Sequence, residues 1–107
     1  MSPEIALCLF RVLQEALQNA AKHSGVRRFD VQLREDTGEV HLDIRDSGQG
    51  FDVNVAMHSR GLGLISMRER VRLVDGTITI DSGPTRGTSI HVHIPIALHH
   101  RRERPVV

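Results

Sequence analysis

The sequence of 107 residues contains no tryptophan, no tyrosine and only three phenylalanines. Its core must therefore be aliphatic, and the length predicts one small domain with a core of modest size. The single cysteine, Cys8, excludes an intrachain disulfide and is typical of a reducing compartment. No apolar run is long enough to span a bilayer.

The sequence also lacks an excess of either charge, because its formal net charge is only +1. The composition therefore gives no reason to expect nucleic acid or a membrane surface as a partner. A hydrophobic content of 39% is ordinary for a soluble globular domain. We expect a cytoplasmic domain without direct membrane contact.

Two stretches have helical spacing of their apolar residues. Ser2-Pro3-Glu4 combines a capping hydroxyl, a proline and an acid, which predicts a helix start, and this helix runs to about His23. Apolar residues then predict a second helix from about Leu62 to Val74, which Asp75-Gly76 ends. Ile65, like its apolar neighbours, is available for burial.

Four stretches alternate apolar and polar residues and predict two hairpins: residues 27–35 with 39–46, and 77–82 with 88–96. In the first stretch Phe29, Val31 and Leu33 share one face, which predicts a half-buried strand. Tight hairpins mean antiparallel pairing, and two amphipathic helices must both cover apolar surface. The order predicts an α+β fold, a two-layer sandwich with the helices on one face of a mixed, mainly antiparallel sheet.

A dinucleotide-binding βαβ fold is disfavoured, because the spacing G-x-G-x-x-G occurs nowhere. We expect residues 1–97 to form the domain and the charged, aperiodic residues 98–107 to form a basic flexible tail.

The first helix carries a polar stripe beside its apolar one. Glu15, Asn19 and Lys22 fall within about 60° of one another around the helix axis. A carboxylate, an amide oxygen and an ammonium in line can bind hydrated Mg²⁺ and the phosphates that it neutralises. By itself the stripe is also the pattern of a solvated face with weak side-chain pairs.

Asp46 ends the second predicted strand on its apolar face, because counting by twos from Val40 reaches it. A buried carboxylate needs a donor, and the amino group of a purine supplies one. Gly48 and Gly50 follow and leave room for a ligand near the backbone. The alternative is a turn with an aspartate cap and two glycines.

Two further glycine motifs are weak when taken alone. Gly61 and Gly63 lead into a helix N-terminus, which suits phosphate but also suits a flexible helix entry. Gly87-Thr88 opens the last strand and is by itself an ordinary hairpin turn.

In this order the four features resemble the GHKL ATPase superfamily, which has the Bergerat fold. It includes the DNA gyrase B subunit, the ninety-kilodalton chaperone, the MutL mismatch-repair proteins and the sensor histidine kinases. The stretches "RVLQEALQNAAKHSG", "DSGQGF" and "GLGLISMRERV" are similar to histidine kinases of the nitrate-sensor-like branch. The resemblance covers about residues 5 to 96.

For the phosphate side of the site, the resemblance implies four roles on the first helix. Asn19 is similar to the Mg²⁺ ligand, and Glu15 to the catalytic acid that orients water on the metal or assists proton removal from the acceptor. Lys22 resembles the base that reaches the phosphates, and His23 the ring beside the adenine or ribose.

For the rest of the site, the resemblance implies that Asp46 reads adenine, with Thr88 assisting it, often through water. Gly48 and Gly50 would shape the pocket floor, and residues 51–60 would form a short ATP lid. A second glycine box beneath the triphosphate would consist of Gly61, Leu62, Gly63 and Leu64.

The resemblance implies an ATP- and Mg²⁺-binding catalytic domain of a two-component sensor histidine kinase. It would deliver the γ-phosphate to a histidine on a separate dimerisation domain, from which a response regulator takes it. That acceptor histidine has no match here, so we expect no activity from the chain alone. The family's usual first strand also has no match before Ser2, which predicts an exposed sheet edge and a weak homodimer through it.

Two other functions fit the same motifs: an anti-sigma-factor-type serine kinase, and a non-catalytic nucleotide-binding interaction module. The remaining histidines, among them His91, His93, His99 and His100, are interpreted as surface residues that at most catch an adventitious metal.

Overall fold

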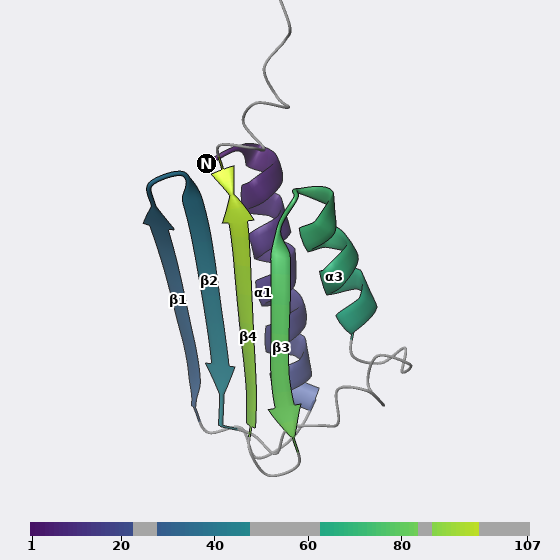
Figure 1. Cartoon of the computed structure of the whole chain (residues 1–107). Coiled ribbons are helices and arrows are strands. Elements are labelled where there is room, and N and C mark those ends of the chain that lie inside the picture. Colours follow the sequence, from purple (N-terminus) through teal and green to yellow (C-terminus); the bar gives the residue numbers. More distant parts are fainter. Residues whose placement is uncertain (23–27, 48–62, 84–86, 97–107) are drawn as a thin grey trace, which may run out of the picture.

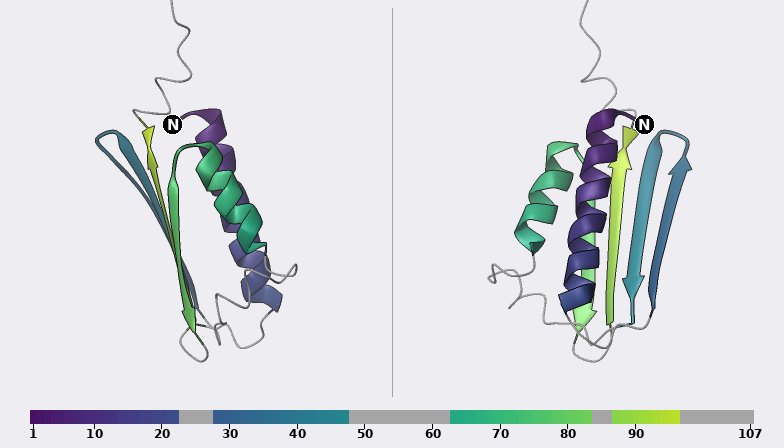
Figure 2. Two further views of the ribbon diagram at one scale, coloured as in Figure 1. Left: turned by 45° about the vertical axis from the view of Figure 1, so that its right-hand side comes forward. Right: turned by 180° about the vertical axis from the view of Figure 1, so that it is seen from behind.

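A computed structural model gives the structure of the chain and describes residues 1–22, 28–47, 63–83 and 87–96. Two helices lie on one face of a four-stranded sheet (Figure 1, Figure 2). This confirms the predicted two-layer α+β fold. The elements in chain order are α1 (Pro3–Lys22), β1 (Phe29–Asp36), β2 (Glu39–Asp46), α3 (Leu64–Leu73), β3 (Thr77–Gly83) and β4 (Gly87–Pro95).

Helix α1 begins where its capping residues predict. The Ser2 Oγ accepts a hydrogen bond from the Ile5 backbone N–H at 3.2 Å. The Ser2 carbonyl oxygen accepts the first helical bond, from the Ala6 N–H at 3.0 Å. Pro3 follows directly, at a position where a missing N–H costs nothing.

Helix α3 begins two residues later than the sequence predicts, because Gly63 at φ 65° is its N-cap. Its predicted stop at Asp75-Gly76 is confirmed. The Gly76 N–H bonds the Val71 carbonyl at 2.9 Å, and the Asp75 N–H bonds the Arg72 carbonyl at 3.0 Å. These paired bonds, with Asp75 left-handed at φ 62°, form a Schellman cap.

The sheet has the strand order β1-β2-β4-β3. Both predicted hairpins form, and β2 also pairs with β4. Each pair is antiparallel, so the described strands contain no parallel pair of the kind that a mixed sheet needs. The edges of this sheet are β1 and β3.

The core lies between the helices and the sheet and is aliphatic, as predicted. Helix α1 packs against β2 and α3, and α3 packs against β3. Complete burial of one such side chain contributes about 1.5–3 kcal/mol. In the described residues, no helix is long and apolar enough to cross a membrane. The fully buried side chains are Ile5, Val12, Val40, Ile44, Leu64, Met67, Val71, Val92 and Ile94.

The prediction that the first strand is half-buried holds for Phe29, which is partly buried against the core, and is wrong for the rest of the strand. Val31 is 45% exposed and Leu33 is 55% exposed. Both helices lie over the other strands, and β1 stands at the far edge of the sheet beyond their reach (Figure 2). The predicted burial of Ile65 on α3 is also wrong, since its side chain is exposed.

Cys8 lies in the core on α1, and burial raises the pKa of its thiol to about 11, while Arg70 opposes this shift. Because the thiolate is the reactive form, Cys8 should react with iodoacetamide at pH 8 far more slowly in the folded chain than in urea. Mass spectrometry of quenched samples checks this. Equal rates in the two states would mean that Cys8 is accessible.

Candidate nucleotide-binding site

Four predicted motifs meet at one end of the molecule. Helix α1 and strand β2 end there, whereas helix α3 and strand β4 begin there (lower end of Figure 1). The chain direction of each element therefore brings together residues that are far apart in the sequence.

Glu15 of α1 lies against Gly63 at the start of α3. A Cβ built on Gly63 would lie 2.8 Å from the Glu15 Cδ and would collide with its carboxylate. Gly63 is also left-handed at φ 65°, a conformation that favours glycine, whereas the Glu15 side chain could rotate away from a Cβ. A carboxylate here faces the positive end of the α3 dipole. This contact joins the polar stripe of α1 to the second glycine motif.

Leu64, the first residue of α3, is buried in the core. Its side chain therefore anchors the start of α3 to the core. Because the Leu64 side chain is buried, any contribution of this residue to a phosphate site comes from its backbone.

Asn19 and Thr88 are the two buried polar residues in the described part of the chain, with exposed fractions of 7% and 8%. Both were selected from the sequence as site residues. Burying a polar side chain is unfavourable unless it is hydrogen-bonded, so such residues are rare in a small aliphatic core. The burial of Asn19 argues against a fully solvated face, which was the alternative for the α1 stripe.

Asp46 lies directly opposite Thr88 in the pairing of β2 with β4. Both continue the buried series of their strands, so both belong to the helix-covered face of the sheet, and Asp46 is partly exposed. Beside them Gly87 has φ 77°, and a Cβ on it would lie 3.4 Å from the Asp46 carbonyl carbon and closer to its oxygen. The G-T motif thus brings the last strand against the strand end that carries Asp46.

Ser82 is a candidate site residue that sequence reasoning missed. Its Oγ donates to the Gly87 carbonyl at 3.1 Å and lies 2.9 Å from the Thr88 Oγ1. The Ser82 hydroxyl has one hydrogen, which it donates to Gly87, so the Thr88 hydroxyl is the donor in the second bond. The lone pairs of the Thr88 oxygen remain available to accept a hydrogen bond. Only the pairing of β3 with β4, which sets Ser82 opposite Thr88, reveals this role.

The other predicted site residues lie outside the described residues. These are His23, Gly48, Gly50, Gly61 and Leu62, together with the predicted lid at 51–60 and the side chain of Lys22. The predicted site residues that the structure describes are Glu15, Asn19, Asp46, Gly63, Leu64 and Thr88.

The arrangement of two helices on one face of an open antiparallel sheet is the fold of histidine kinase ATP-binding domains. A solved histidine kinase domain, from the blue-light activated histidine kinase of Erythrobacter litoralis EL346, superposes with a TM-score of 0.71. It is 25% identical, and the match covers 92% of this chain and 48% of that one.

The chain belongs to the family described as histidine kinase-, DNA gyrase B-, and HSP90-like ATPase, whose model matches residues 5–98. Membership of this family implies ATP binding, as predicted, and confirms the resemblance recognised in the sequence.

Two relatives of the chain within this family are named as histidine kinases. The chain is 40% identical over 100 residues to the signal transduction histidine-protein kinase/phosphatase DegS of Bacillus subtilis, covering 92% of this chain and 26% of DegS. It is 40% identical over 93 residues to the oxygen sensor histidine kinase NreB of Staphylococcus carnosus, covering 87% of this chain and 27% of NreB. The chain thus spans about a quarter of the length of these relatives.

Proposed function

We propose that this chain is the ATP- and Mg²⁺-binding catalytic domain of a sensor histidine kinase. It delivers the γ-phosphate of ATP to a histidine on a separate dimerisation domain. The contact of Glu15 with Gly63 is the observation that carries this proposal, because it joins the α1 stripe to the helix start expected beneath the triphosphate. The histidine kinase names of the relatives favour it over a serine kinase or a non-catalytic module.

On the adenine side, Asp46 accepts a hydrogen bond from the amino group of the base. A charge-assisted bond of this kind contributes about 1.5–3 kcal/mol. Thr88 assists from the opposite strand. The Thr88 hydroxyl donates to Ser82, which leaves the lone pairs of Thr88 for the ligand. Gly48 and Gly50 leave space for the base.

On the phosphate side, the donors suit Mg²⁺, because this hard cation prefers oxygen ligands such as amide and carboxylate oxygens. Asn19 supplies the ligand on α1, and Glu15 orients water or accepts the proton of the acceptor. When bound, Mg²⁺ supplies neutralisation of the phosphate charge. Lys22 and His23 extend the site, and we assign phosphate binding to the backbone N–H groups of the second glycine box, Gly61-Leu62-Gly63-Leu64. The rest of catalysis is positioning.

We further propose the setting of this domain. Residues 1–97 form the domain in the cytoplasm, and residues 98–107 form a basic tail. Its partners are the dimerisation domain of the same kinase and, through it, a response regulator. The open edge of β1, with its exposed Val31 and Leu33, supports weak pairing of two copies.

The nucleotide pocket is tested by replacing Asp46 with asparagine, which keeps the shape and removes the charge. Nucleotide affinity should fall at least tenfold, which is about 1.4 kcal/mol, with the melting temperature nearly unchanged. Calorimetric titration of ATP with and without Mg²⁺ measures this. Asp30→Asn is the control, because Asp30 is an exposed acid on β1 that pairs with Arg28. Unchanged affinity in Asp46→Asn would exclude the assignment of the pocket.

A further inference from the structure

The face of the sheet that the helices leave open carries a cluster of histidines and acids. It consists of Glu39, His41 and Asp43 on β2 and His91 and His93 on β4. Strand pairing sets His41 opposite His93 and Asp43 opposite His91. None of the five has a role in the proposed nucleotide site, which lies at the strand ends on the other face.

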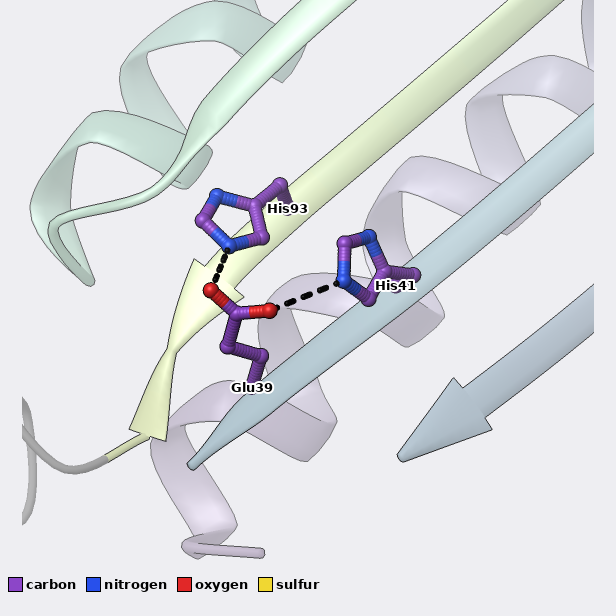
Figure 3. Close-up of side chains that lie close together, drawn as sticks. All are labelled: Glu39, His41 and His93. Atoms are coloured by element: carbon purple, nitrogen blue, oxygen red, sulfur yellow. Dashed lines mark hydrogen bonds and ion pairs between the residues drawn. The ribbon is translucent and has the colours of Figure 1, made fainter. Parts of the chain in front are cut away.

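Glu39 stands between two imidazoles (Figure 3). Its Oε1 lies 3.0 Å from the His93 Nε2, and its Oε2 lies 3.4 Å from the His41 Nε2. One ligand atom from each of the three residues lies within 4.8 Å of the other two. The His41 side chain is only 15% exposed and that of His93 is 30% exposed, so the sheet restricts their movement.

A second line of contacts orients His41. The His91 Nδ1 lies 2.7 Å from the Asp43 Oδ1, and the His91 Nε2 lies 3.5 Å from the His41 Nδ1. A carboxylate only accepts, so the His91 Nδ1 carries hydrogen and, in the neutral ring, its Nε2 accepts. The hydrogen of neutral His41 then belongs on Nδ1, where it points to His91.

This assignment leaves the His41 Nε2 with a lone pair that faces a Glu39 oxygen. Two acceptors at 3.4 Å repel each other unless a cation lies between them. A proton satisfies the pair, and so does a metal ion. A ligating histidine usually donates its other ring N–H to an outer acceptor, and here the acceptor nearest the His41 Nδ1 is the His91 ring, which Asp43 orients.

We propose that Glu39, His41 and His93 bind a divalent transition metal ion of the zinc type, with His91 and Asp43 as positioning residues. Imidazole nitrogen and carboxylate oxygen are ligands that Zn²⁺ prefers, and three protein ligands leave one position for water. Around tetrahedral Zn²⁺ at about 2.0–2.2 Å, ligand atoms lie about 3.4 Å apart. The His93 Nε2 is 3.0 Å from one Glu39 oxygen and the His41 Nε2 is 3.4 Å from the other. A set with one atom from each residue lies within 4.8 Å, so small side-chain rotations would complete the site.

The neighbouring strands are compatible with a bound cation. On β3, Thr77 and Thr79 lie opposite His93 and His91 and carry no charge. On β1, Arg34 lies opposite His41. The guanidinium of Arg34 forms an ion pair with Asp36 at 3.3 Å, which offsets its charge. The ion would link β2 to β4, the two central strands, and should therefore raise the melting temperature of the chain.

The test is a titration of the metal-free chain with Zn²⁺ against a chromophoric chelator, without nucleotide. We expect one ion per chain. His41→Gln and His93→Gln should each weaken binding at least tenfold and reduce the rise in melting temperature caused by Zn²⁺. His91→Gln should weaken binding less, because it loses only the support of His41. The Co²⁺ complex should show the intense visible bands of tetrahedral coordination.

The control is His99→Gln/His100→Gln, which removes two histidines that are not among the proposed ligands and that lie outside the described residues. It should bind Zn²⁺ as the parent chain does. Binding that persists in both His41→Gln and His93→Gln, or that is lost in the control, would overturn the proposal, as would no binding by the parent chain. ATP affinity should be unchanged in all variants, so this result stands apart from the test of Asp46.

Discussion

Replacing Gly87 with alanine is expected to destabilise the domain by about 2–4 kcal/mol. Two costs combine at this position. The backbone is left-handed at φ 77°, which an L-residue with a Cβ adopts at a penalty of about 1–2 kcal/mol. In addition, the new methyl group would collide with the carbonyl oxygen of Asp46 on the neighbouring strand. Backbone is involved on both sides, so neither group can rotate away.

Gly38→Ala separates these two costs. Gly38 has nearly the same φ, 73°, but lies in the exposed turn between β1 and β2. Its replacement should cost only about 1–2 kcal/mol, the penalty of the left-handed backbone. Thermal melts of both variants give the comparison, at roughly 4–8 °C for each kcal/mol in a domain of this size. Equal losses of stability in the two variants would mean that the close approach of Gly87 to Asp46 adds nothing to the cost of the Gly87 substitution.

The start of α1 and the end of α3 were predictable because their causes are local. Ser2 and Pro3 act within one turn of α1, and Asp75-Gly76 closes the last turn of α3. The start of α3 was misplaced by two residues, because Gly61 and Gly63 are equally able to precede a helix. What distinguishes Gly63 is the carboxylate of Glu15, a contact from another part of the chain.

The burial of β1 was not predictable, because alternation of apolar residues shows that a strand has two faces but not whether anything covers one of them. Val31 and Leu33 alternate as well as Leu42 and Ile44 do. Only the strand order decides between them, since the helices cover the inner strands and leave the edge strand exposed.

The open-face histidines show the same limit. Alternation places His91 and His93 on one face of β4, and this pattern alone predicts only surface histidines that at most catch an adventitious metal. His41 and Glu39 join them only through the pairing of β2 with β4, which no local pattern specifies. For the nucleotide site, by contrast, the stripe of α1 singled out Asn19 from the sequence alone. The structure shows that Asn19 is buried, and its role as a Mg²⁺ ligand stays a prediction.

Replacing Asn19 with alanine should reduce phosphotransfer to the dimerisation-domain histidine by about 100-fold or more. This corresponds to about 2.7 kcal/mol of lost stabilisation, and we expect it because the amide oxygen is the proposed Mg²⁺ ligand on α1. Binding of ATP without Mg²⁺ should change little, since adenine is read by Asp46. The measurement is transfer of labelled phosphate from ATP to a separately supplied dimerisation domain. Without that domain the chain should not become labelled.

Gln18→Ala is the matched control for this variant. Gln18 is also an amide on α1, one residue earlier, but it faces solvent whereas Asn19 is buried. Gln18→Ala should transfer phosphate at the normal rate. Because Asn19→Ala also removes a buried polar group, thermal melts must show that it remains folded at the assay temperature. Near-normal transfer by a folded Asn19→Ala variant would exclude the Mg²⁺ role, since no other described side chain on α1 combines an amide oxygen with burial.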